Sequence, residues 1–110
     1  MKKIFIVLLM SILTGHSALA ATSGWVHEVD VSRVVVVVNG GVNVRIQPDL
    51  SDCTSQSGYG PKYASIRPDH PGLEKMYSAL LAALMSKTKV SLYLGDDKCT
   101  VGEVVIGGRY

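Results

Sequence analysis

Apolar residues recur at helical spacing in one segment of the chain. Between residues 70 and 86 they lie three and four positions apart, with alanines between them, which predicts an amphipathic helix over about 70–86. Asp69 can cap the first free N–H groups of this helix, and Lys87 and Lys89 suit its negative end. The predicted apolar stripe consists of Leu73, Met76, Tyr77, Leu80, Leu81, Leu84 and Met85.

Strands are predicted on both sides of this helix, because apolar and polar residues alternate there or form short apolar runs. In the first strand the alternation places Trp25, His27, Val29 and Val31 on one face. Residues 34–38 are five consecutive valines, which is typical of a central strand or of an edge that a partner covers. The expected strands, about six in all, are 25–31, 34–38, 42–46, 63–67, 90–94 and 101–106.

A strand-rich chain with one helix between late strands indicates the α+β class. The pattern fits a small, partly open barrel or a mostly antiparallel sheet with one face covered by the helix. Residues 49–61 are rich in Ser, Gly, Asp and Thr and predict an exposed loop. Because neither a repeat nor a linker is visible, we expect residues 21–110 to form a single small domain.

The first twenty residues have the pattern of a secretory signal peptide. Lys2 and Lys3 precede an apolar run from Ile4 to Leu13, and small residues lead to a cleavage site between Ala20 and Ala21. A membrane anchor is the alternative, but the run is too short for about 30 Å of hydrocarbon, which takes about 20 residues. The expected destination is therefore the periplasm or the exterior, without membrane insertion.

Removal of this segment changes the charge of the chain. The formal net charge of +2 is accounted for by Lys2 and Lys3, so residues 21–110 are neutral. No run of Lys and Arg remains in the sequence, and such a run is the usual mark of a protein that binds nucleic acid or anionic membrane. We therefore expect neither partner.

Cys53 and Cys99 are the only cysteines of the chain. In an oxidising compartment the economical interpretation is one disulfide, which would stabilise so small a core by roughly 4 kcal/mol. Redox catalysis and zinc binding are disfavoured because the spacing is not that of a CxxC motif.

No motif of a hydrolase, zinc protease, P-loop or dinucleotide-binding protein occurs, so we predict no catalytic residue, no metal and no cofactor. Asp69 and His70 are explained by the start of the helix. Asp96 and Asp97 indicate a solvated turn, since a calcium loop spreads its ligands over about twelve residues. A small hydrolase with paired carboxylates stays open, although nothing singles out two of Glu28, Asp30, Glu74 and Glu103.

The order of elements from Cys53 to Ile106 resembles that of a known group of proteins. A cysteine in a polar loop, a short strand, the segment MYSALLAALMSKTKVSLYL and a second cysteine in a turn resemble small secreted bacterial proteins. The pattern is similar to the receptor-binding B subunits of subtilase-cytotoxin-like and pertussis-like AB-five toxins. This chain is shorter, has at most one disulfide and lacks their aromatic-rich helix. The resemblance implies an OB-like barrel, a ring of five subunits and glycan binding. The family's further partner is a toxin A subunit, to which nothing in this chain itself points.

Two residues are candidates for binding sugar. The resemblance implies that Ser32, just before the valine run, contacts the glycan, although it could simply end a strand. Tyr59 lies among serine and glycine residues, where an aromatic ring has little core to fill and can stack on a sugar; alternatively it folds over the disulfide. The expected function is a secreted, non-catalytic, glycan-binding subunit of a homo-oligomer. The alternative is a monomeric binding or inhibitory module.

Overall fold

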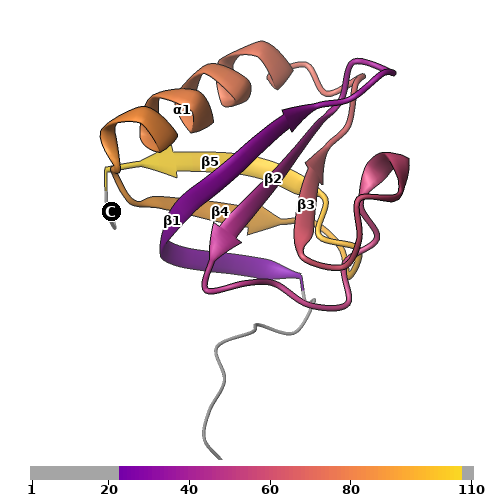
Figure 1. Ribbon diagram of the computed structural model, residues 1–110, viewed down its shortest axis with the longest axis horizontal. Coiled ribbons are helices and arrows are strands. Elements are labelled where there is room, and N and C mark those ends of the chain that lie inside the picture. Colours follow the sequence, from indigo (N-terminus) through magenta and orange to yellow (C-terminus); the bar gives the residue numbers. More distant parts are fainter. Residues whose placement is uncertain (1–22, 108–110) are drawn as a thin grey trace, which may run out of the picture.

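The computed structural model describes residues 23–107, in which five strands form one antiparallel sheet with one α-helix (Figure 1). The strand order is β3-β2-β1-β4-β5, and the helix connects β3 to β4. This confirms the predicted α+β class. The elements are β1 (Gly24–Val36), β2 (Val42–Gln47), the short 3-10 helix η1 (Gln56–Gly58), β3 (Tyr63–Ile66), α1 (Leu73–Ser86), β4 (Val90–Leu94) and β5 (Val101–Ile106).

The sheet approaches a barrel without closing. Its two edge strands come together where Ser65 of β3 and Thr100, next to β5, form an isolated parallel bridge. The Ser65 N–H also donates to the Cys99 carbonyl at 3.0 Å. The predicted barrel is therefore an open sheet whose edges meet at one end, and the helix lies across β1 and β5 (Figure 1).

The long strand β1 takes part in both halves of the sheet. Its first half pairs with β4, where Trp25 faces Tyr93, and its second half pairs with β2, where Val36 faces Val42. The register shifts between Val26 and Val29 and again between Val31 and Arg33, as at β-bulges. Two predicted strands are thus one strand, which explains why residues 23–107 contain five strands rather than about six.

The first irregularity reverses which side chains face the core. Glu28 has a φ of 54°, in the left-handed region, and the alternation changes phase around it. Val29 and Val31 are consequently buried, while Trp25 and His27 lie on the opposite face, beside Tyr93 and Ser91. The prediction that these four residues share one face was wrong, because it assumed an unbroken period of two.

The valine run lies at the end of β1 and continues into the turn. β1 is the middle strand in the strand order, but its valine-rich second half pairs with β2 alone and is therefore paired along one edge only. Val37 is buried, whereas Val36 and Val38 are 57% and 99% exposed.

The helix packs on the core through part of its predicted stripe. Met76, Leu80 and Ala83 are buried, with Leu80 fully enclosed. Leu81 and Met85 are 38% and 76% exposed, so their assignment to the buried stripe was wrong. The buried face of the helix is narrower than the predicted stripe, because the helix packs mainly on two strands, β1 and β5.

The start of the helix also differs from the prediction. The N-cap position is Gly72, without a side-chain cap, and Asp69 instead forms an ion pair with Arg67 at 3.4 Å. His70 Nδ1 accepts a hydrogen bond from the Gly72 N–H at 2.8 Å. Asp69 therefore lies too early in the chain to cap a helix that begins at Leu73.

Cys53 and Cys99 form the predicted disulfide, with a Cα–Cα distance of 5.4 Å. The bond joins the β2–β3 loop to the turn between β4 and β5, and a disulfide fits an oxidising compartment. No helix within residues 23–107 is long and apolar enough to span a membrane. The predicted signal peptide and its cleavage site at Ala20 and Ala21 lie outside the described residues.

Candidate functional site

A row of polar side chains crosses three neighbouring strands on the outer face of the sheet. Arg33 of β1 is paired in register with Arg45 of β2, and Arg45 is paired with Tyr63 of β3. Residues in such cross-strand positions have side chains on the same face. Their neighbours along the strands, Val44 and Ala64, are buried in the core, so the row lies on the other face of the sheet, where Arg33 is exposed, Arg45 is half-buried and Tyr63 is buried.

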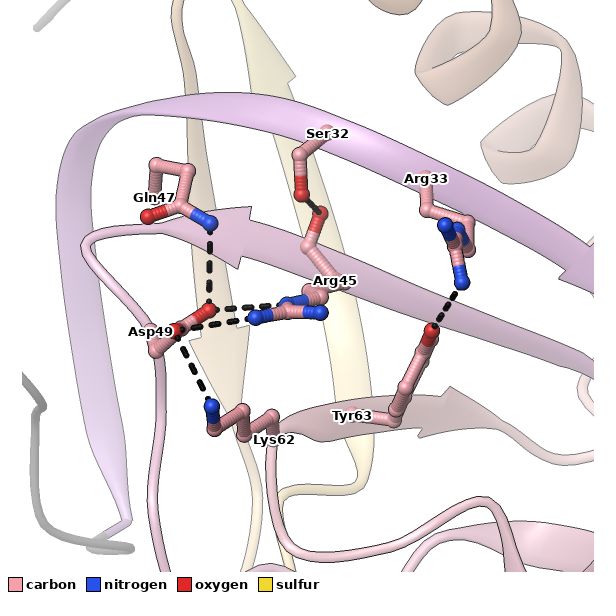
Figure 2. A network of polar contacts seen from close by, with 7 residues as sticks. All are labelled: Ser32, Arg33, Arg45, Gln47, Asp49, Lys62 and Tyr63. Atoms are coloured by element: carbon pink, nitrogen blue, oxygen red, sulfur yellow. Dashed lines mark hydrogen bonds and ion pairs between the residues drawn. The ribbon is translucent and has the colours of Figure 1, made fainter.

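Asp49 fixes the central arginine of this row (Figure 2). Its two carboxylate oxygens accept hydrogen bonds from Arg45 Nε at 2.9 Å and Nη2 at 3.1 Å. Gln47 Nε2 also donates to Asp49 at 3.1 Å, and Lys62 Nζ lies 3.6 Å from its second oxygen. A two-point bond of this kind fixes the plane of a guanidinium group as well as its position.

The pairing shifts the pKa of Asp49 and the pKa of Arg45 in the directions that favour their charged forms. The hydrogen bond from Arg45 is the main cause that lowers the pKa of Asp49, and Lys62 adds to the effect. The same bond raises the pKa of Arg45. Asp49 is therefore a carboxylate under ordinary conditions and is poorly suited to donate a proton in catalysis.

Arg33 presents a second guanidinium group at the end of the row. Its Nη1 donates to the Tyr63 hydroxyl at 3.3 Å, and Figure 2 shows the two side chains pointing toward each other. Arg33 is exposed, and a guanidinium group has N–H donors beyond the one used here. These donors have the planar geometry that binds a carboxylate at two points.

Both sequence candidates lie against this row. Ser32, at the second irregularity of β1, donates through Oγ to the backbone carbonyl of Arg45 at 3.1 Å. Tyr59 is 48% exposed, and its ring meets that of Tyr63 edge-on, with 5.7 Å between centroids. Ser32 lies within β1 rather than at its end. Ser32 thus meets the row through the Arg45 backbone and also lines a hollow with Leu84 and Lys87, whereas Tyr59 meets the row through Tyr63.

We call this surface the basic–aromatic patch. It holds three cations and one carboxylate, although residues 21–110 are neutral as a whole. The sequence shows no run of basic residues, because these cations come from three separate segments. Chemically, the patch offers cationic donors for an anionic group and a Tyr59 ring for an apolar face. It comprises Ser32, Arg33, Arg45, Asp49, Tyr59, Lys62 and Tyr63.

The other carboxylates that were considered for catalysis lie elsewhere. Asp30 is bound by Lys89, whose Nζ is 3.0 Å from both oxygens. Glu28 is at the first irregularity of β1, Glu74 is in the first turn of α1, and Glu103 is on β5. Within residues 23–107 there is also no group of three or more His, Cys, Asp or Glu that could hold a metal ion.

A second aromatic cluster lies on the other half of the sheet. The rings of Trp25 and His27 are stacked, with centroids 5.6 Å apart and planes 7° from parallel. Tyr93 is tilted against Trp25 at 5.3 Å, and the buried Ser91 hydroxyl lies 3.3 Å from His27 Nδ1. Sequence reasoning missed this cluster because it placed Trp25 and His27 on the face of the buried valines.

Sequence reasoning also missed the arginines and Tyr63 of the patch. Arg45 alternates with the apolar Val44 and Ile46, which indicates an outward side chain. That signal identifies an exposed residue but not its neighbours. The register that aligns Arg33, Arg45 and Tyr63 depends on three strands from separate segments of the chain.

Comparisons with known proteins add no family to this picture. No protein-family model matches the chain, and no match was found among curated proteins. The similarity to toxin B subunits stays a prediction from the sequence pattern.

Proposed function

We propose that this protein is an exported, non-catalytic subunit that binds an acidic glycan through the basic–aromatic patch. The observation that carries the proposal is the aligned row of Arg33, Arg45 and Tyr63, with Asp49 fixing its centre. Because Asp49 engages Arg45 at two points, Arg33 is the arginine best placed to meet a carboxylate on the ligand.

The rest of the patch fits the remaining parts of a sugar. The exposed Tyr59 ring offers a face for apolar C–H groups, while Ser32 Oγ can also accept hydrogen bonds from sugar hydroxyls. The sequence resemblance independently suggests Ser32 as a sugar contact. A sialylated glycan combines such a carboxylate, hydroxyl groups and an apolar ring face.

Assembly into a ring, with five subunits as the resemblance implies, is part of the proposal. A single shallow sugar site typically binds with a dissociation constant near 1 mM, or about −4 kcal/mol. Several copies in one ring multiply the effective affinity without new contacts. A toxin A subunit is a possible further partner of such a ring.

A glycan array probed with the mature protein tests the proposal. Binding should concentrate on sialylated or otherwise acidic glycans, and Arg33→Gln should reduce it about tenfold, as for the loss of one charge-assisted contact. Lys75→Gln is the control, since Lys75 is an exposed cation on α1, outside the patch. Equal binding by wild type and Arg33→Gln, or binding of neutral glycans only, would contradict the assignment.

The second candidate function is a monomeric binding or inhibitory module. It is favoured by the burial of Val37 and the packing of Val34 on the core within a single chain, because this part of the valine run needs no partner subunit. Light scattering during size-exclusion chromatography separates the two functions. A mass near five times that of one chain supports the ring, whereas the mass of one chain supports the module.

A further inference from the structure

A polar cavity of about 340 Å³ lies at the end of the sheet where its edges meet. It is formed by the β1–β2 turn, the β2–β3 loop, β3 with the segment that follows it, and the turn between β4 and β5. None of the residues of the basic–aromatic patch lines it. The lining residues used below are Asn39, Thr54, Gln56, Arg67, Lys98 and Thr100.

The side chain of Gln56 holds one wall of this cavity in place. Its Oε1 accepts a hydrogen bond from Asn39 Nδ2 at 3.1 Å, and its Nε2 donates to the Ile66 carbonyl at 2.8 Å. Gly41 makes this position possible, because a Cβ there would collide with the Gln56 amide. The amide groups on this wall are therefore fixed before any ligand binds.

The opposite wall is fixed by backbone and covalent bonds. Asp96 Oδ1 accepts hydrogen bonds from the N–H groups of Lys98 at 3.0 Å and Thr100 at 3.1 Å. The Cys53–Cys99 disulfide and the bond from the Thr54 N–H to the Lys98 carbonyl, at 3.4 Å, join this turn to the loop. A cavity with walls held in this way loses little conformational freedom when it binds a ligand.

The charges around the cavity are mixed. Arg67, Lys98 and Asp96 line it, and Arg67 is paired at 3.4 Å with Asp69, which lies outside the lining. Amide groups and hydroxyls supply most of the other lining, and Pro68 is the apolar exception. Such a lining has donors and acceptors for an uncharged ligand rich in hydroxyls, in contrast to the cationic patch.

We infer that the polar cavity is a second binding site, which takes a neutral monosaccharide unit. Its volume lies at the lower end of the range of about 300–1,000 Å³ found for small-molecule sites. The ligand class rests on the proposed glycan-binding function, while the location rests on the cavity itself. The protein would then bind an acidic sugar unit at the basic–aromatic patch and a neutral sugar unit in the polar cavity.

Nuclear magnetic resonance titration of the mature protein tests this inference. Galactose, glucose, mannose and N-acetylglucosamine are each added to about 10 mM, well above the dissociation constant of about 1 mM expected for a weak sugar site. At least one should shift the backbone amides of Thr54, Lys98 and Thr100. Sialic acid is titrated separately, and its binding to the patch is followed through the backbone amides of Arg33 and Tyr63.

The two titrations distinguish the failure of each proposal. If none of the four neutral sugars moves the cavity amides, the second site is wrong, whatever sialic acid does. If a neutral sugar moves them while sialic acid leaves the patch unchanged, the cavity site stands and the acidic-glycan assignment fails.

Variants of Thr54 test whether the neutral sugar binds in the cavity itself. Thr54→Val keeps the shape of the side chain but removes its hydroxyl, and should weaken binding of the neutral sugar about fivefold, as for one lost hydrogen bond. Thr54→Trp should block the cavity and abolish the shifts. Ser78→Ala, which removes an exposed hydroxyl from α1, is the matched control and should bind as wild type. Unchanged binding by both Thr54 variants, with wild-type spectra otherwise, would overturn the inference.

Discussion

Arg45 and Asp49 form a two-point ion pair that links β2 to the loop that follows it, with N–O distances of 2.9 and 3.1 Å. The side chains are 29% and 21% exposed, so the pair is only partly open to solvent. Lys62 and Gln47 approach the same carboxylate. Asp49 therefore organises one side of the basic–aromatic patch, and its protonation state matters for stability.

Asp49→Asn should weaken the response of stability to acid. The pKa of Asp49 is lowered in the folded protein, so its contribution is present above the ordinary value of 3.8 and is lost as pH falls through the folded pKa. Urea midpoints measured between about pH 5 and pH 2 should fall more steeply for wild type than for Asp49→Asn. Parallel curves for the two proteins would show that the pair does not contribute.

Replacement of the disulfide by Cys53→Ala and Cys99→Ala should lower the free energy of unfolding by about 2–5 kcal/mol. The bond reduces the conformational entropy of the unfolded chain. In the folded protein it also anchors the loop that carries Tyr59 and Lys62. Urea denaturation of the double variant, compared with oxidised wild type, measures the loss. Wild type kept in reductant should behave like the variant, and equal midpoints for all samples would contradict the prediction.

Leu80→Ala should destabilise the protein by about 2–5 kcal/mol, because Leu80 is fully buried on the core-facing side of α1. Met85→Ala is the matched control on the same helix. Since Met85 is 76% exposed, its truncation should change the urea midpoint little. Similar losses for the two variants would contradict the orientation of α1.

Lys87→Gly should stabilise the end of the helix by about 1 kcal/mol. Lys87 is the C-cap residue and has a φ of 60°, a left-handed conformation that glycine adopts without the steric cost of a Cβ. Ala82→Gly, at an exposed position inside the helix, should instead destabilise by about 1 kcal/mol. Thermal unfolding followed by circular dichroism checks the opposite signs, and the same sign for both would contradict the C-cap geometry.

Exported protein should begin at Ala21 and be two hydrogen atoms lighter than its reduced sequence. Intact mass spectrometry of the periplasmic or culture fraction tests both expectations at once. A retained N-terminus, or two thiols that react with an alkylating reagent, would contradict them.

The sequence was informative where the signal is local. Apolar spacing around Leu80 identified the helix, and a lone pair of cysteines identified the bond between Cys53 and Cys99. The strand segments after Gly41 were also recognised, since apolar residues recur in them at strand spacing.

The errors arose where the outcome depends on tertiary structure. A glutamate gives little sign that it will adopt a left-handed conformation, so the phase change at Glu28 was invisible and Trp25 was placed on the wrong face. For the same reason the two valine-rich segments were separated at Ser32, where the strand in fact continues through an irregularity. The register that pairs Arg33 with Arg45 depends on that irregularity. It could not be predicted from a sequence in which the irregularity leaves no signal.

The position of the disulfide has a consequence for when the protein becomes competent to bind. Before oxidation, the β2–β3 loop and the β4–β5 turn are joined by backbone hydrogen bonds such as those from Thr54 to Lys98 and from Ser65 to Cys99. A chain still in a reducing cytoplasm would hold the cavity walls and the loop of Tyr59 only through such contacts. Under the proposed function, oxidation of this disulfide after export would complete the support of both proposed sugar sites, so that binding would depend on the redox state of the compartment as well as on the fold.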